Sequence, residues 1–130
     1  MNIRENFTGI QHIGIPTNDI AKTISFYESI GFEVALKTFN KEANEAVAFL
    51  KLGNLVIETY ENHNAEMCSG AINHIAVNVK SIDDAYNSIC QNDLNNTNDE
   101  IHYLPFWDNG VKFFTIEGPN KERIEFSQYI

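Results

Sequence analysis

Residues 10–15 read IQHIGI, and residues 72–77 read INHIAV. These stretches open two copies of one pattern, because Asp19 and Ser81 follow them at the same distance and the residue numbers of the copies differ by a constant 62. Repetition of a unit of this length predicts two similar supersecondary modules that pack as a pair. The repeat therefore decides the expected fold.

Each copy opens with a strand-like stretch and continues with a helical pattern. Asp19 and Ser81 are residue types that favour the N-cap position, and apolar residues then return on one helical face. Shorter alternating runs, separated by turns such as Gly53-Asn54, predict three further strands in each copy. The first copy is predicted to contain a strand at 9–16, a helix after Asp19 and strands at 32–39, 46–53 and 55–61. The second copy is predicted to contain a strand at 71–79, a helix after Ser81 and strands at 101–105, 111–117 and 123–129.

The length and the repeat together predict the domain organisation. A chain of 130 residues has the usual size of one domain. We therefore expect a single α+β domain over residues 1–130, built from two tandem βαβββ modules. Module 1 would span about 9–61 and module 2 about 71–129, with a linker between them.

Composition excludes several classes of protein. Nine Lys and Arg against eighteen Asp and Glu give a formal charge of −9, and such a surface repels the phosphates of nucleic acids. No apolar run suggests a signal peptide or a membrane span. Cys68 and Cys90 stand too far apart for a C-x-x-C motif, and nothing requires them to pair. These features predict a cytoplasmic protein with neither a nucleic-acid nor a membrane partner.

One histidine and one glutamate recur at matching places in the two copies. They are His12 and Glu58 in the first copy, and His74 and Glu125 in the second. Strand alternation puts each of them opposite neighbours that are mostly apolar and that can pack under the helix of the same module. The four side chains are therefore expected to face a shared concavity.

This set of side chains has the chemistry of a metal site. Two neutral imidazoles and two carboxylates suit a divalent first-row metal ion, and the carboxylates balance its charge. Four protein ligands around an octahedral ion leave two positions for water or for substrate oxygens. We therefore predict a metal site formed by His12, Glu58, His74 and Glu125.

These residues, set in paired modules, resemble the vicinal oxygen chelate superfamily, which contains glyoxalases, bleomycin-resistance proteins and dioxygenases. Within it they resemble glyoxalase I (lactoylglutathione lyase). VIETY at 56–60, HIAV at 74–77 and the six-residue step from Pro119 to Glu125 carry the resemblance, which extends from about Ile10 to Tyr129. Extradiol dioxygenases and fosfomycin-modifying relatives use two His and one Glu, whereas Glu58 fills the second carboxylate position here.

The resemblance implies a lyase or isomerase that converts the hemithioacetal of a 2-oxoaldehyde and a thiol through a metal-bound enediolate. Glu125 would transfer the proton between adjacent carbons, Glu58 would be its counterpart, and His12 and His74 would hold the ion. The compact length resembles bacterial forms that favour nickel or cobalt, with zinc as a further candidate. A homodimer is also implied.

Four other positions are candidate substrate contacts. Asn62 occupies the place of the family's glutathione-contacting asparagine, four residues after Glu58. The family's arginine is replaced by Pro16, which can neither pair with a carboxylate nor donate a hydrogen bond. Arg123 and Lys112 are residues that could compensate. The candidate substrate contacts are Tyr60, Asn62, Trp107 and Arg123, and His63 and His102, which lie outside the repeat, are expected to be surface residues.

Two alternatives remain open on the sequence. One is a different metalloenzyme of the same superfamily with another oxyanion substrate, which Pro16 favours. The other is a non-enzymatic protein that binds a small cationic molecule, like the bleomycin-resistance members, which the negative charge favours.

Overall fold

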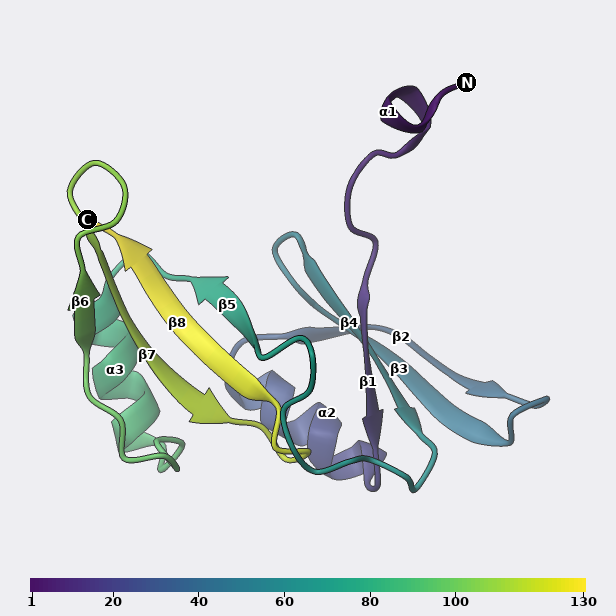
Figure 1. Ribbon diagram of the computed structural model, residues 1–130. Helices are drawn as coiled ribbons and strands as arrows, with labels where there is room; N and C mark the ends of the chain where they lie inside the picture. Colours follow the sequence, from purple (N-terminus) through teal and green to yellow (C-terminus); the bar gives the residue numbers. More distant parts are fainter. The chain divides into compact units, whose positions relative to one another are not determined.

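The computed structural model describes all 130 residues, which form two compact units, Met1–Ala65 and Glu66–Ile130 (Figure 1). Unit 1 contains one four-stranded sheet with the strand order β1-β4-β3-β2. β1 runs parallel to β4, and the other neighbours are antiparallel. The elements of unit 1 are α1 (Ile3–Asn6), β1 (Ile13–Thr17), α2 (Ile20–Ser29), β2 (Glu33–Asn40), β3 (Glu45–Leu52) and β4 (Leu55–Glu61).

Unit 2 repeats this arrangement, with the strand order β5-β8-β7-β6 and β5 parallel to β8. The predicted pair of βαβββ modules is therefore confirmed, and so is the α+β class. The predicted strands at 55–61, 111–117 and 123–129 are found at those residues. The elements of unit 2 are β5 (His74–Asn78), α3 (Ile82–Gln91), β6 (His102–Leu104), β7 (Val111–Glu117) and β8 (Arg123–Tyr129).

Both long helices begin where the sequence predicts. The side chain of Asp19 accepts from the backbone N–H of Lys22, and that of Ser81 accepts from the N–H of Asp84. The first backbone N–H of each helix also has an acceptor, because the last strand of the unit supplies a side-chain oxygen. Glu61 Oε2 accepts from Ile20 at 2.7 Å, and Gln128 Oε1 accepts from Ile82 at 2.8 Å. The start of each helix is thus tied to the strand that carries the glutamate of the same unit.

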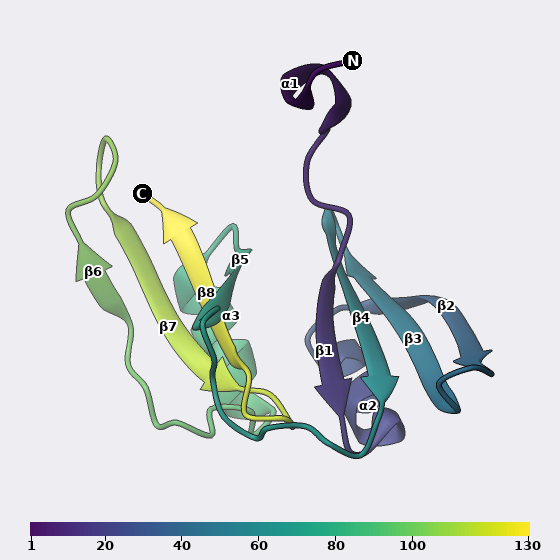
Figure 2. The ribbon, with the colours of Figure 1, turned by 45° about the vertical axis from the view of Figure 1, so that its right-hand side comes forward.

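In each unit the helix covers one face of the sheet (Figures 1 and 2). In unit 1 the core between α2 and the sheet contains Tyr27 of the helix and Leu50 and Ile57 of the sheet, and all three are fully buried. In unit 2 the core under α3 is aromatic, since Phe114 stacks on Phe126 with ring centroids 5.1 Å apart. The opposite face of each sheet is left for the functional side chains.

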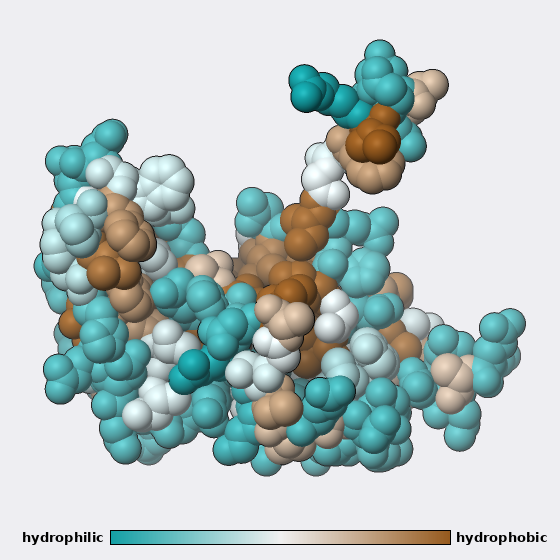
Figure 3. Space-filling view, viewed as in Figure 1, coloured by the Kyte–Doolittle hydropathy of each residue, from teal (hydrophilic) through white to brown (hydrophobic).

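The first strand of each module starts later than predicted. β1 begins at Ile13 and β5 at His74, because only five residues of each strand pair with the parallel neighbour. Residues 9–12 and 71–73 continue the apolar alternation but lie outside the ladder. A short helix, α1, precedes residues 9–12 and has no buried residue. Its segment exposes apolar side chains, visible as brown areas at the N-terminal end in Figure 3.

None of the helices has the length and apolar composition needed to cross a membrane. Both cysteines are free and exposed.

Candidate metal-binding site

A histidine and a glutamate lie side by side in each unit. His12 Nε2 is 3.7 Å from Glu58 Oε1, and His74 Nε2 is 3.7 Å from Glu125 Oε2. The parallel pairing explains this proximity, because β1 places Gly14 beside Glu58 and β5 places Ala76 beside Glu125. The same geometry arises twice from the repeated sequence.

The predicted strand phase is confirmed for both glutamates. Ile57 and Thr59 are buried on the helix side of β4, and Ile124 and Phe126 are buried on the helix side of β8. The glutamate between each pair therefore points to the other face of its sheet. Glu125 is the more protected of the two, with 19% of its side chain exposed against 30% for Glu58.

Each histidine is also held by the amide side chain of the residue before it. His12 Nδ1 is 2.8 Å from Gln11 Oε1, and His74 Nδ1 is 3.0 Å from Asn73 Oδ1. An amide oxygen only accepts, so these contacts favour the Nδ1–H tautomer, in which Nε2 keeps the lone pair that a metal ion can bind. Outer partners of this kind orient metal-binding histidines in proteins. Sequence reasoning missed these amides, although they stand one residue before each histidine in both copies.

The donor set fits a divalent ion. Bonds of about 2.0–2.2 Å to nitrogen and oxygen ligands place two such atoms roughly 3–3.6 Å apart. The observed separation of 3.7 Å is at the edge of this range, and a small side-chain rotation closes the difference. No third His, Cys, Asp or Glu joins either pair in a metal-binding group. Each unit thus supplies two of the four predicted ligands, and the joining of the pairs at one ion stays a prediction.

The amide contacts yield a testable expectation. Replacing Asn73 with alanine removes the acceptor for Nδ1–H, so the His74 ring is expected to populate both tautomers. The affinity for Ni²⁺ is expected to fall roughly 10–100-fold, as for other losses of an outer partner. Ring ¹⁵N chemical shifts report the tautomer, and calorimetric titration reports the affinity. Asn78→Ala, an exposed residue at the far end of β5 from His74, is the matched control. Equal results for the two variants would remove the assigned role of Asn73.

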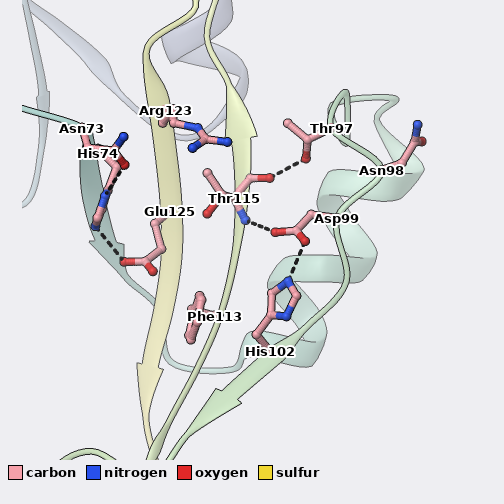
Figure 4. A pocket seen from close by; sticks show the side chains of 10 residues that line it. All are labelled: Asn73, His74, Thr97, Asn98, Asp99, His102, Phe113, Thr115, Arg123 and Glu125. Carbon is pink, nitrogen blue, oxygen red and sulfur yellow. Dashed lines mark hydrogen bonds and ion pairs between the residues drawn. The ribbon is translucent and has the colours of Figure 1, made fainter. Parts of the chain in front are cut away.

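Unit 2 contains a cavity of about 450 Å³ beside its histidine–glutamate pair. Figure 4 shows His74 and Glu125 on one side of it and Asp99 and His102 on the other. His102 was expected at the surface, and the expectation was incomplete because its half-exposed ring lines this cavity. Its place at the start of β6, three residues after an aspartate, was the available signal.

Asp99 holds His102 in a defined position. Asp99 Oδ1 is 2.7 Å from His102 Nε2, and Asp99 Oδ2 accepts from the backbone N–H of Thr115 at 2.9 Å. Partial burial acts to raise the pKa of Asp99. The hydrogen bonds from His102, Thr115 and Glu100 outweigh that effect, and the pKa lies below its ordinary value. Asp99 is therefore ionised at neutral pH and fixed by its donors.

The four predicted substrate contacts have different surroundings. Tyr60 is half-buried on β4, two residues after Glu58, and Asn62 follows β4, where its side chain accepts from the N–H of Asn64. Trp107 is 74% exposed, and its ring lies against Tyr129. Only Arg123 lines the cavity of unit 2. Their contact with a substrate stays a prediction.

Comparison with known proteins shows the family of the chain. The sequence profile of the glyoxalase/bleomycin resistance protein/dioxygenase superfamily matches residues 9–126. The uncharacterised protein YwbC of Bacillus subtilis (strain 168) is 32% identical over 125 residues, which cover 92% of this chain and 96% of YwbC.

Solved structures share the fold at lower identity. The glyoxalase family protein from Enterococcus faecalis matches with a TM-score of 0.71 and 22% identity, covering 93% of this chain and 98% of that one. The fosfomycin resistance protein FosX from Listeria monocytogenes, in complex with Mn(II) and sulfate, matches with a TM-score of 0.70 and 18% identity over 95% and 94% of the two chains. Since the profile spans nearly the whole chain, the protein belongs to the glyoxalase/bleomycin resistance protein/dioxygenase superfamily.

Proposed function

We propose that the protein is a metalloenzyme in which His12, Glu58, His74 and Glu125 bind one divalent ion. The observation that carries this proposal is the repetition of the histidine–glutamate pair with the same 3.7 Å separation in both units. The contacts of Nδ1 with Gln11 and Asn73 also favour, in both pairs, the tautomer whose Nε2 can bind a metal. The FosX structure that shares the fold contains Mn(II). For this chain we propose nickel or cobalt, with zinc as the further candidate.

The proposed reaction is the isomerisation of a hemithioacetal formed from a 2-oxoaldehyde and a thiol such as glutathione. A bound divalent ion would polarise two adjacent oxygens of such a substrate. Glu125 is the proposed general base, because it lines the cavity and is the less exposed of the two glutamates. It would move a proton between neighbouring carbons, while His12 and His74 keep their Nε2 atoms toward the ion.

Another reaction of the superfamily, on an anionic substrate without glutathione, is the second candidate. Pro16 favours it, since β1 has no cation at the place where glyoxalase I would need one. The polar cavity of unit 2, with Arg123 in its lining, favours it as well. A homodimer in the cytoplasm is proposed for both candidates.

Metal analysis and a glutathione-dependent assay test the proposal in two steps. The purified protein is expected to bind one Ni²⁺ or Co²⁺ per chain, measured by elemental analysis after dialysis. The loaded protein is expected to convert methylglyoxal and glutathione to the thioester, and Glu125→Gln, assayed at a Ni²⁺ concentration that saturates the variant, to lower the rate by about 10²–10⁴-fold. A loaded but inert protein would reject the glyoxalase reaction and favour the second candidate, whereas absence of metal binding would reject both.

A further inference from the structure

We propose that the cavity of unit 2 binds an oxyanion group of the substrate through Arg123, beside the His102 ring that Asp99 holds in place. This inference rests on the proposed function for the nature of the substrate. The chemical class is a small molecule that carries a carboxylate or a phosphate.

Arg123 is a cation without a counter-ion in the structure. It lines the cavity, and no carboxylate lies within ion-pair distance of its guanidinium. The residue beside it on β7 is Glu117, but that carboxylate pairs with Lys121 at 3.3 Å. A guanidinium presents several N–H donors in a planar fork that matches carboxylate and phosphate oxygens. Arg123 is therefore available for an anionic ligand.

The carboxylates of the cavity are already engaged. Asp99 accepts from His102 on one oxygen and from the backbone of Thr115 on the other. Glu125 lies beside His74 and is the proposed ligand of the ion. His102 directs Nε2 to Asp99, and its ring lies against Phe113 with centroids 5.5 Å apart. Both residues of the Asp99–His102 dyad are thus fixed before a ligand enters, which lowers the entropic cost of binding.

The repeat distinguishes the proposed metal ligands from the proposed substrate contacts. Because Glu125 corresponds to Glu58, Arg123 corresponds to Val56, and Thr115, which lies beside Glu125, corresponds to Phe49. By the same register His102 on β6 corresponds to Thr38 on β2. The histidine–glutamate pair is present in both units, whereas the cation and the Asp99–His102 dyad occur in unit 2 alone. The pair that occurs in both units fits a metal ion that the two units would share. The residues that occur only in unit 2 fit a substrate whose two ends differ.

Inorganic phosphate is the probe for this subsite. We would titrate it into the full-length ¹⁵N-labelled protein, first metal-free and then loaded with Ni²⁺, and follow the Arg123 side chain and the His102 ring. Saturable shifts are expected with a Kd of about 1–10 mM. Arg123→Gln is expected to raise that Kd at least about tenfold, since it removes the positively charged guanidinium group. His102→Gln is expected to raise it by a smaller factor.

Lys80→Gln is the matched control, because it removes one positive charge from an exposed residue of unit 2 that does not line the cavity. Equal phosphate affinity in Arg123→Gln and Lys80→Gln would overturn the inference. So would the absence of saturation up to roughly 100 mM phosphate, or binding that requires Ni²⁺ and is unaffected by Arg123→Gln. Failure of metal binding alone would reject the proposed function, while the metal-free titration would still decide the role of Arg123.

Discussion

Replacing Glu125 with glutamine is expected to abolish tight binding of Ni²⁺. Loss of an outer partner of a metal ligand costs roughly 10–100-fold in affinity, so loss of a charged ligand is expected to reach at least the upper end of that range. Glutamine keeps the size of the side chain but removes its negative charge, and that charge is what balances the ion. Calorimetric titration at fixed pH measures the change, and circular dichroism confirms that the variant is folded.

Glu58→Gln in unit 1 is expected to have a similar effect, because both carboxylates would bind the same ion. A double-mutant cycle sharpens this expectation. If one ion is shared, the two substitutions disrupt the same event and their effects are strongly non-additive. If each histidine–glutamate pair held its own ion, the titration of the unaltered protein would show two sites and each substitution would remove one.

Glu33→Gln is the control for the general effect of removing a negative charge. Glu33 is an exposed residue at the start of β2 and belongs to neither pair. Its replacement is expected to leave the Ni²⁺ affinity within about a factor of two, as for a screened surface charge. A comparable loss in Glu33→Gln would mean that Ni²⁺ binds to the acidic surface in general, and the four-ligand site would be wrong.

The local sequence contains enough information to predict most of the fold. Asp19 and Ser81 identify both helix starts, because their side chains accept the N–H three residues later. Alternation along β4 and β8 predicts which face each glutamate occupies, since one side of each sheet must be buried under a helix. These are short-range effects, and they act on each copy of the repeat independently.

Features that depend on pairing between distant segments were harder to predict. The apolar alternation continues through residues 9–12, but the ladder between β1 and β4 begins only at Ile13, which pairs with Ile57. The role of His102 depends on Asp99 reaching Thr115 on another strand, which periodicity does not encode. Whether the two histidine–glutamate pairs share one ion depends on contacts between modules, and the pattern within one module carries no information about them.

The core of unit 2 supplies the other large expected effect. Replacing Phe114 with alanine is expected to lower the free energy of unfolding by about 3–5 kcal/mol. The Phe114 side chain is fully buried, stacks on Phe126 and meets the ring of Tyr86 edge-on at 5.1 Å. Its removal would leave a cavity directly beneath the strand that carries Glu125. Urea unfolding followed by circular dichroism measures the change.

Phe113→Ala is the matched control, since it makes the same substitution one residue earlier on the opposite face of β7. Phe113 is only half-buried and packs on the His102 ring, so its loss is expected to cost less than half as much as the loss of Phe114. The two variants also separate stability from function. Phe114→Ala would weaken Ni²⁺ binding by unfolding the strand that holds Glu125, whereas Phe113→Ala would keep that strand in place. Equal destabilisation by both substitutions would contradict the assigned strand phase, and with it the face on which the glutamate lies.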